Sequence, residues 1–266
     1  MARCRGVVPS LLCLLGLTAA LPAAASVVIA GTRVIYRAAE PEVTLKLSND
    51  GKTPSLLESW IDDGDATATP TNAKAPFTIT PPLARIDPTK SQTLRITYVP
   101  DPAKALPQDR ESLFYFNVLE VPPKPVDTPA TAGSSPAAAS SSGAPARRNW
   151  LQLAIRSRLK LFYRPAGVKG TVQEALPQLT WHLGREAGHA VLIVRNPSPY
   201  YVTFNQVALR SGGREVKATL GTHDMLAPGA QQALPLESEP PAAAQVHVQI
   251  LNDLGGLSEA DRPLSP

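Results

Sequence analysis

The chain has 266 residues, of which 43% are hydrophobic, 5% are aromatic and 28 are prolines, and its formal net charge is +4. The basic residues are scattered along the sequence, so this charge does not indicate a nucleic-acid-binding stripe. Proline is about twice as frequent as in average proteins, which favours short strands, turns and loops over helices.

The first 25 residues are typical of a secretion signal. Arg3 and Arg5 form a basic start, residues 7–17 form an apolar segment, and the three alanines at 23–25 fit the cleavage pattern. The apolar segment is too short for a membrane-spanning helix, and no later apolar run reaches the required length of about 18 residues. We therefore expect residues 1–25 to be a signal peptide.

Cleavage after residue 25 would leave 241 residues with a net charge of +2. It would also remove Cys4 and Cys13, the only cysteines of the chain. The mature protein would then have neither a disulfide nor a cysteine metal site, although an exported protein meets an oxidising compartment. Its stability must come from packing.

Apolar and polar residues alternate in several short runs, which is the pattern of half-buried strands. The runs cover residues 43–48, 93–98, 113–121, 190–195, 200–209, 231–236 and 245–251. Turn sequences rich in glycine, proline and asparagine separate them, and no segment has a sustained helical period. The sequence predicts an all-β protein made of sandwiches.

Residues 125–146 are a tract of proline, alanine, serine, threonine and glycine. Such a composition cannot bury enough apolar area to offset the entropy lost on ordering. We interpret the tract as a flexible loop of about residues 125–148 inside the first domain, between two paired strands. Its composition is also compatible with a linker between domains.

Residues 150–165 follow as one long alternating strand. Its apolar row is Leu151, Leu153, Ile155, Leu159 and Leu161, and its polar row is Gln152, Arg156, Arg158 and Lys160. The predicted strand is more than twice the usual five or six residues, so part of it could be offered to another chain. The ordinary interpretation of the apolar row is domain core, whereas the basic row suggests an anionic partner.

A short elbow at residues 164–167 ends this strand and marks the better domain boundary. We expect one domain over residues 26–163 and a second over 164–266. An exposed apolar edge strand is an aggregation hazard. We therefore also expect the free protein to cover the long strand, by self-association or with the loop.

Seven stretches of the chain resemble the periplasmic pilus chaperones of bacterial chaperone–usher systems, in the order that the family has them. They are TRVIY, LSNDGKTPSLLESWI, ITPPLARIDP, LPQDRESLFYFNVLEVPP, IRSRLKLFYRP, RNPSPYYVTF and LNDLGG. The resemblance implies two immunoglobulin-like sandwiches set at an angle like a boomerang. It also implies an ATP-independent chaperone without cofactor or metal, whose partners are pilus subunits and an outer-membrane usher.

In this family the chaperone lends a strand to an incomplete pilus subunit, which is a form of β-strand addition. By resemblance, Arg33 and Lys160 would hold the subunit's C-terminal carboxylate, and we expect both side chains to be largely hydrated in the free protein. The side chains inserted into the subunit would be Leu151, Leu153 and Ile155. Without the resemblance, Arg33 would be taken for an ordinary exposed arginine.

The resemblance further implies an ion-pair network of Glu111, Arg164 and Asp253 that sets the angle between the domains. Three features depart from the family. The long loop lacks the cysteine pair that usually accompanies it, and the second domain lacks a disulfide that many members have. The chain also ends soon after Gly256, where relatives usually add a strand, so the sequence leaves open whether the second domain is complete.

Two other functional classes remain to be weighed against a chaperone. The chain could itself be a pilin or adhesin, or it could be a secreted enzyme or carbohydrate-binding module on a sandwich scaffold. The sequence contains no nucleophile motif and no phosphate-binding glycine loop. His182 and His189 could face each other across a hairpin, but no third metal ligand lies nearby.

Overall fold

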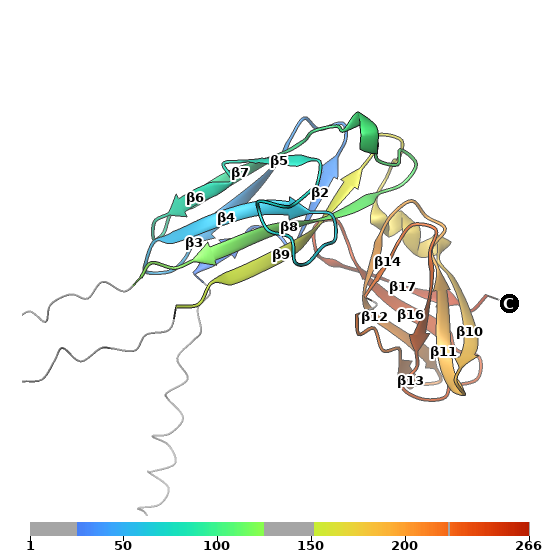
Figure 1. The fold of residues 1–266 in the computed structure, drawn as a ribbon. Coiled ribbons are helices and arrows are strands. Elements are labelled where there is room, and N and C mark those ends of the chain that lie inside the picture. The colour runs from blue at the N-terminus through green and yellow to red at the C-terminus, as the bar shows by residue number, and fades with distance from the viewer. Residues whose placement is uncertain (1–25, 125–151, 223, 266) are drawn as a thin grey trace, which may run out of the picture.

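The computed structural model describes residues 26–124, 152–222 and 224–265. In this part of the chain the strands form two β-sandwiches, domain one and domain two, which lie at an angle to each other (Figure 1). The predicted all-β fold of two angled sandwiches is confirmed. The predicted signal peptide, the loop at 125–148 and Leu151 lie outside the described residues.

Domain one contains a four-stranded sheet of order β1-β3-β7-β5 and a five-stranded sheet of order β2-β9-β8-β4-β6. Its strands are β1 (Val27–Ile29), β2 (Arg33–Arg37), β3 (Val43–Asn49), β4 (Ser55–Asp62), β5 (Phe77–Thr80), β6 (Leu83–Ile86), β7 (Ser91–Tyr98), β8 (Ser112–Val121) and β9 (Ile155–Arg164). A short 3-10 helix, η2 (Pro102–Lys104), lies between β7 and β8.

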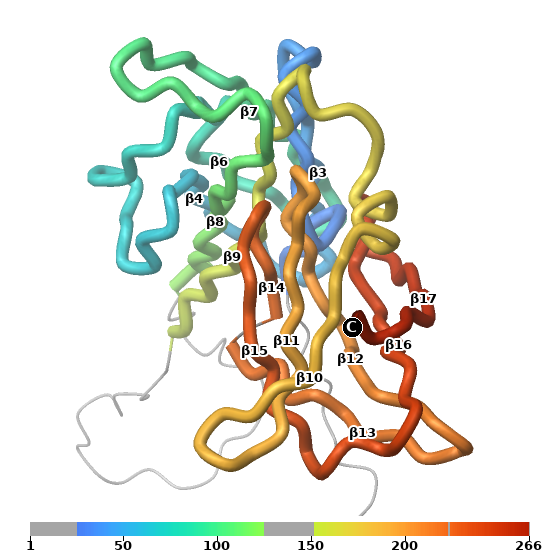
Figure 2. Tube along the Cα trace, turned by 90° about the vertical axis from the view of Figure 1, so that its right-hand side faces the viewer, coloured from blue at the N-terminus to red at the C-terminus, as the bar shows by residue number. Residues whose placement is uncertain are grey.

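Domain two contains a three-stranded sheet of order β10-β11-β15 and a sheet of order β13-β12-β16-β17, in which β14 also pairs with β12. Its elements are η3 (Val172–Gln178), β10 (Thr180–Glu186), β11 (His189–Arg195), β12 (Val202–Ser211), β13 (Arg214–Lys217), β14 (Met225–Leu226), β15 (Gln231–Pro235), β16 (Gln245–Leu251) and β17 (Leu257–Pro263). Figure 2 shows β10, β11 and β15 together in front of β12 and β16.

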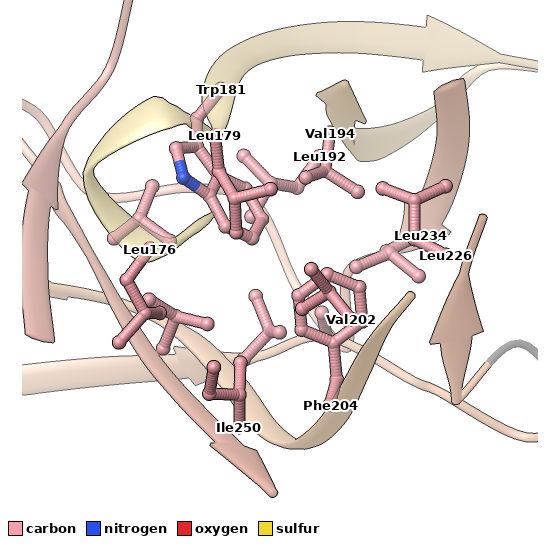
Figure 3. Packing of buried hydrophobic residues seen from close by; sticks show 14 of the residues in the cluster. Leu176, Leu179, Trp181, Leu192, Val194, Val202, Phe204, Leu226, Leu234 and Ile250 are labelled. Carbon is pink, nitrogen blue, oxygen red and sulfur yellow. The ribbon is translucent and has the colours of Figure 1, made fainter. Parts of the chain in front are cut away.

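The cores follow from the alternation in the sequence. In β3, Leu45 and Leu47 are buried between the two sheets of domain one, while Thr44 and Lys46 are exposed. In domain two the fully buried Trp181 packs beside Phe204, with their rings 6.0 Å apart, among aliphatic side chains from both sheets (Figure 3). Each sandwich therefore has its own hydrophobic core, as a domain requires.

The long strand is shorter than predicted. It was expected over residues 150–165, but β9 covers Ile155–Arg164. The reason lies in its partner, because pairing between β8 and β9 runs from Ser112↔Tyr163 to Glu120↔Ile155, and β8 ends one residue later, at Val121, before Pro122 and Pro123. Prolines have no amide hydrogen to donate, so the ladder ends there.

The strand that the sequence left open in domain two is present. β17 pairs with β16 at seven positions, from Gln245↔Pro263 to Leu251↔Leu257. Its sequence, LSEADRP, is mostly polar because it forms the outer strand of its sheet, and its residues are alternately exposed and half-buried. Because the strand is mostly polar, hydrophobic alternation in the sequence does not predict it.

The two histidines do not face each other. The hairpin between β10 and β11 turns at Ala187 and Gly188, which both have positive φ, and its register pairs Glu186 with His189 and His182 with Ile193. Among the described residues no group of three or more histidine, cysteine or acidic side chains could hold a metal ion. No helix in that same part of the chain is long and apolar enough to cross a membrane.

Candidate functional site

The parallel pairing of β2 with β9 places Arg33 beside Lys160. These two residues are the first pair of the ladder, which continues to Arg37↔Arg164. Paired residues of neighbouring strands project from the same face of a sheet. The side chains of these two cations therefore project side by side from domain one, although the residues are 127 positions apart in the sequence. They lie at the junction with domain two, where each contacts that domain.

Lys160 forms an ion pair across this junction. Its Nζ lies 2.9 Å from Oδ2 of Asp224 in domain two, and its side chain is 22% exposed. The ammonium group is thus already held by a carboxylate. The expectation that Lys160 is largely hydrated in the free protein is wrong, because domain two brings an acid within hydrogen-bond distance.

Arg33 is also partly enclosed. Its Nη1 donates a hydrogen bond of 3.3 Å to the carbonyl of Leu251, and its guanidinium lies 5.8 Å from the ring centre of Phe162. Burial lowers the pKa of Arg33, although the nearby carboxylates oppose this shift. Its Nε is buried without a hydrogen-bond partner. Arg33 is therefore not the hydrated side chain that we expected, and it has an unused donor.

The first half of β9 has an open backbone edge. β8 lies on one side of the whole strand, but on the other side β2 pairs only with Lys160–Arg164. Before Arg33 the chain turns away at Gly31, whose φ is +117°, and β1 joins the other sheet. Within the described residues, no strand covers the edge of residues 155–159 (Figure 1).

The apolar row of β9 changes character along the strand. Leu161 and Tyr163 are buried in the core of domain one, whereas Ile155 is 51% exposed and Leu153, just before the strand, is 62% exposed. The interpretation of the row as core holds for its second half only. Cover from the loop or from a second copy stays a prediction, because residues 125–151 are outside the described part.

Arg156 and Arg158, two residues of the basic row, stabilise the fold of domain one. Arg158 binds the buried carboxylate of Asp62 with both Nη2 and Nε, at 2.6 and 3.1 Å, and Arg156 lies 3.7 Å from it. Burial on its own would raise the pKa of Asp62, but the hydrogen bonds from Arg158 and Asn117 outweigh it and the pKa is lowered. Both arginines thus share one buried acid and have contacts within domain one, so the row does not offer three free cations to an anionic partner.

The three residues of the expected interdomain network meet at the end of β9. Arg164 binds Asp253 through Nη1 and Nη2, both at 2.8 Å, and donates from Nε to Glu111 at 2.8 Å. Arg164 and Glu111 are almost completely buried. Burial on its own would lower the pKa of Arg164, but the hydrogen bonds to Asp253 and the charge of Glu111 outweigh it and the pKa is raised.

Two short motifs position domain two against this network. Buried Asn196 donates from Nδ2 to the carbonyl of Tyr200 at 2.7 Å, which fixes the loop that presents the amide of Tyr201 to Glu111. Gly255 has a φ of +81°, and a Cβ on it would lie 2.3 Å from Oγ1 of Thr32. A glycine is therefore required where the turn between β16 and β17 approaches the start of β2.

Sequence reasoning missed Asp224. It lies in a polar stretch between strands, and its partner Lys160 is 64 positions away, so no local pattern connects them. Sequence reasoning also missed the carbonyl of Leu251, which accepts a hydrogen bond from Arg33. Every residue has a main-chain carbonyl, so the sequence does not indicate which one will accept a particular hydrogen bond.

Two family models match the chain. Residues 26–169 match the N-terminal domain of the PapD family, described as a pili and flagellar-assembly chaperone, and residues 174–262 match the C-terminal domain of the PapD pili assembly chaperones. Together they cover both sandwiches. The matched ranges meet near the elbow that follows β9.

Two curated relatives are also described as chaperones. The chaperone protein FimB/FhaD of Bordetella pertussis is 45% identical, over 89% of this chain and 88% of its own length. The probable fimbrial chaperone YadV of Escherichia coli K12 is 41% identical, over 90% of each chain.

Solved structures agree with these matches. The crystal structure of the YadV chaperone has a TM-score of 0.70 and 37% identity, over 90% of this chain and all of that one. The SafB chaperone of Salmonella enterica, solved in complex with the SafA pilin, has a TM-score of 0.68 and 28% identity, over 90% of this chain and 96% of that one. These comparisons favour a chaperone over a pilin, an adhesin or a carbohydrate-binding module.

Proposed function

The chain belongs to the family of fimbrial chaperones of the chaperone–usher pathway, and on that premise we propose that it captures pilus subunits in the periplasm by donor-strand complementation. It would bind a subunit without ATP, cofactor or chemical reaction and deliver it to an outer-membrane usher. One observation carries the proposal, namely that the open edge of β9 ends at a pair of cations.

The open edge supports addition of a foreign strand. Residues 155–159 have backbone groups that β2 does not use, and such an edge is a template for main-chain hydrogen bonds. The captured strand would lie in line with β2 and end where β2 begins. Its carboxyl terminus would then reach Arg33 and Lys160, so we infer that it runs parallel to β9.

The two cations would fix the register of this strand. A carboxylate accepting from Arg33 and Lys160 forms charge-assisted hydrogen bonds, each worth roughly 1.5–3 kcal/mol. The unused Nε of Arg33 provides a donor for it. A slip by one residue would turn the neighbouring apolar side chains to the wrong face, so pinning the terminus also selects which side chains insert.

The exposed part of the apolar row would complete the subunit's core. Leu153 and Ile155 project beyond the core of domain one, and Leu151 continues the same alternation in the sequence. Each side chain could contribute about 1.5–3 kcal/mol if it became fully buried, before the cost of association is subtracted. We also propose that the domains divide between residues 163 and 164, at the end of β9, with Glu111, Arg164 and Asp253 holding the angle.

Substitution of the two anchors tests this proposal. Arg33→Ala and Lys160→Ala should each reduce co-purification of pilus subunits from the periplasm to background, while the thermal unfolding midpoint changes by no more than a few degrees. Lys46→Ala is a matched control, because Lys46 is an exposed lysine of β3 in the other sheet of domain one. Normal capture by both anchor variants would overturn the assignment.

A further inference from the structure

Asp224 lies at the junction of the two domains, next to a short strand of domain two. It directly precedes β14, whose Met225 pairs with Thr203 of β12, and its own carbonyl accepts a hydrogen bond of 2.7 Å from the amide of Phe204. The backbone of Asp224 is therefore bonded to β12. From there Oδ2 reaches Nζ of Lys160 at 2.9 Å.

The ion pair between Lys160 and Asp224 resembles chemically the contact that we propose between Lys160 and the C-terminal carboxylate of a captured subunit. In both cases one carboxylate binds the ammonium of Lys160 at the mouth between the domains. Arg33, the neighbour of Lys160, pairs with a carbonyl and keeps its Nε without a partner. Arg33, Lys160 and Asp224 together carry a net charge of +1, which matches one incoming carboxylate.

We propose that Asp224 is an internal competitor for the subunit's terminal carboxylate. In the empty cleft it occupies Lys160, and on capture the subunit's carboxylate displaces it. This inference rests on the proposed function and adds a regulatory contact to the same site. The competitor weakens binding of stray anions and lowers the barrier to release, since Asp224 returns to Lys160 as the subunit leaves.

The size of the effect follows from the exposure of the pair. The Asp224 side chain is 48% exposed and that of Lys160 is 22% exposed, so water partly screens the contact. Ion pairs of this kind shift equilibria by up to about fivefold. Removal of the acid also removes its repulsion of an incoming carboxylate. We therefore expect Asp224→Asn to tighten binding on the order of fivefold, without a large change in stability.

The test compares two synthetic peptides that alternate apolar and polar residues and match β9 in length, one with a free C-terminal carboxylate and one amidated. Binding to the mature wild-type protein and to Asp224→Asn is measured at low salt and at about 1 M salt, where the Debye length is about 3 Å. Asp50→Asn is the control, because Asp50 is an exposed acid near Ser26, far from the cleft.

If Asp224 competes with the subunit's carboxylate, Asp224→Asn should bind the carboxylate peptide more tightly than the wild-type protein does and should bind the amidated peptide equally well. The difference in affinity between the two proteins should be smaller at high salt. Equal affinity of the wild-type and Asp224→Asn proteins for the carboxylate peptide overturns it, as does equal tightening for both peptides. Failure of the proposed function is a separate result, in which the wild-type protein does not distinguish carboxylate from amide.

A measurement without peptide tests the contact itself. In the free wild-type protein, the side-chain ammonium of Lys160 should give a nitrogen NMR signal with slowed hydrogen exchange, because Asp224 holds it. Asp224→Asn should abolish the slowing, and the Asp50→Asn control should keep it. Identical exchange of this ammonium in the wild-type protein and in Asp224→Asn contradicts the proposal, whatever the peptides do.

Discussion

Asp62 is a charged residue whose contacts stabilise the fold. Its side chain is fully buried, and it receives hydrogen bonds from Arg158 and Asn117. Arg156 in turn lies over the ring of Trp60, with 4.8 Å between the guanidinium carbon and the ring centre, and donates to the carbonyl of Ala66. The acid thus attaches the outer face of β9 to β4 and the segment after it.

The replacement Asp62→Asn should lower the free energy of unfolding by about 2 kcal/mol, because it leaves two partly buried arginines without their counter-charge. Denaturant unfolding measures this loss. Arg85→Gln is a suitable comparison, since Arg85 pairs with exposed Asp87 and its loss should change stability by less than about 1 kcal/mol. An equal loss in both variants would contradict the structural role of Asp62.

The same carboxyl group predicts a pH dependence. Its pKa is lowered in the folded protein, so its stabilising contribution is present above its ordinary pKa near 3.8 and is lost as the pH falls through the lower folded value. Denaturant unfolding of the wild-type protein and of Asp62→Asn between pH 7 and about pH 3 should show this. The wild-type advantage should shrink below about pH 4, and a constant advantage would argue against an ionised Asp62.

Residue-level prediction from the sequence reached those positions that lie in family motifs. Arg33, Lys160, Glu111, Arg164 and Asp253 were named from such motifs, and the structure places the first two side by side and the other three in contact. Their local surroundings were not predictable. Partners such as Asp224 come from another domain, and only the packing of the two sandwiches brings them near.

Among the elements, β9 combines two environments in one strand. Its second half is paired on both sides and packs into the core, while its first half has one pairing partner and exposed apolar side chains among the described residues. A strand of uniform sequence pattern can therefore be structural at one end and available for binding at the other. Alternation alone does not distinguish these ends, because burial depends on what lies opposite.

Alanine substitution along β9 should separate the two halves. Leu161→Ala should lower the free energy of unfolding by about 2–5 kcal/mol, because Leu161 is fully buried. Ile155→Ala should leave stability nearly unchanged and weaken subunit capture, because Ile155 is half exposed in the free chain. Unfolding and co-purification assays on both variants check this, and the idea fails if Ile155→Ala destabilises as much as Leu161→Ala.

Truncation after Gly256 tests the outer strand of domain two. Loss of β17 removes its ladder to β16, in which each hydrogen bond contributes about 0.5–1.5 kcal/mol, and exposes the fully buried Val248 and Ile250. Calorimetry should show domain two unfolding at a clearly lower temperature than in the full chain. An unchanged transition would mean that β17 contributes little to the sandwich.

Prediction of the elements succeeded where strands are half buried and failed at edges. The runs at 43–48, 93–98 and 245–251 lie within β3, β7 and β16. The sequence does not reveal β17, because an outer strand needs few apolar residues, and it overextends β9, because the prolines that limit its ladder lie in the segment after β8. The parallel pairing of β2 with β9 depends on long-range topology, which the family resemblance implied only indirectly.

At the scale of the whole molecule, the angle between the sandwiches depends on a few polar contacts. Arg164 joins Glu111 in domain one to Asp253 in domain two, and Arg37 lies 3.7 Å from the same aspartate. The amide of Glu111 also donates to the carbonyl of Pro199 at 2.9 Å. These contacts fix the place where Asp224 and Leu251 face the two cations.

Asp253→Ala should loosen this arrangement. It leaves the buried Arg164 with one carboxylate instead of two, which destabilises the junction by about 3 kcal/mol while each sandwich keeps its core. X-ray scattering should show a broader distribution of overall dimensions, and subunit capture should weaken. Asp87→Ala, which removes an exposed acid of domain one, should change neither. A scattering profile identical to that of the wild-type protein would contradict the role given to the network.

Hydrogen exchange at the first half of β9 tests the central claim most directly. The amides of residues 155–159 that point away from β8 should exchange more slowly in a complex with a pilus subunit than in the free chain, because the captured strand bonds to that edge. The same measurement on Arg33→Ala should show no slowing. If a bound subunit leaves these amides as fast as they are in the free protein, capture occurs elsewhere and the proposed donor strand is wrong.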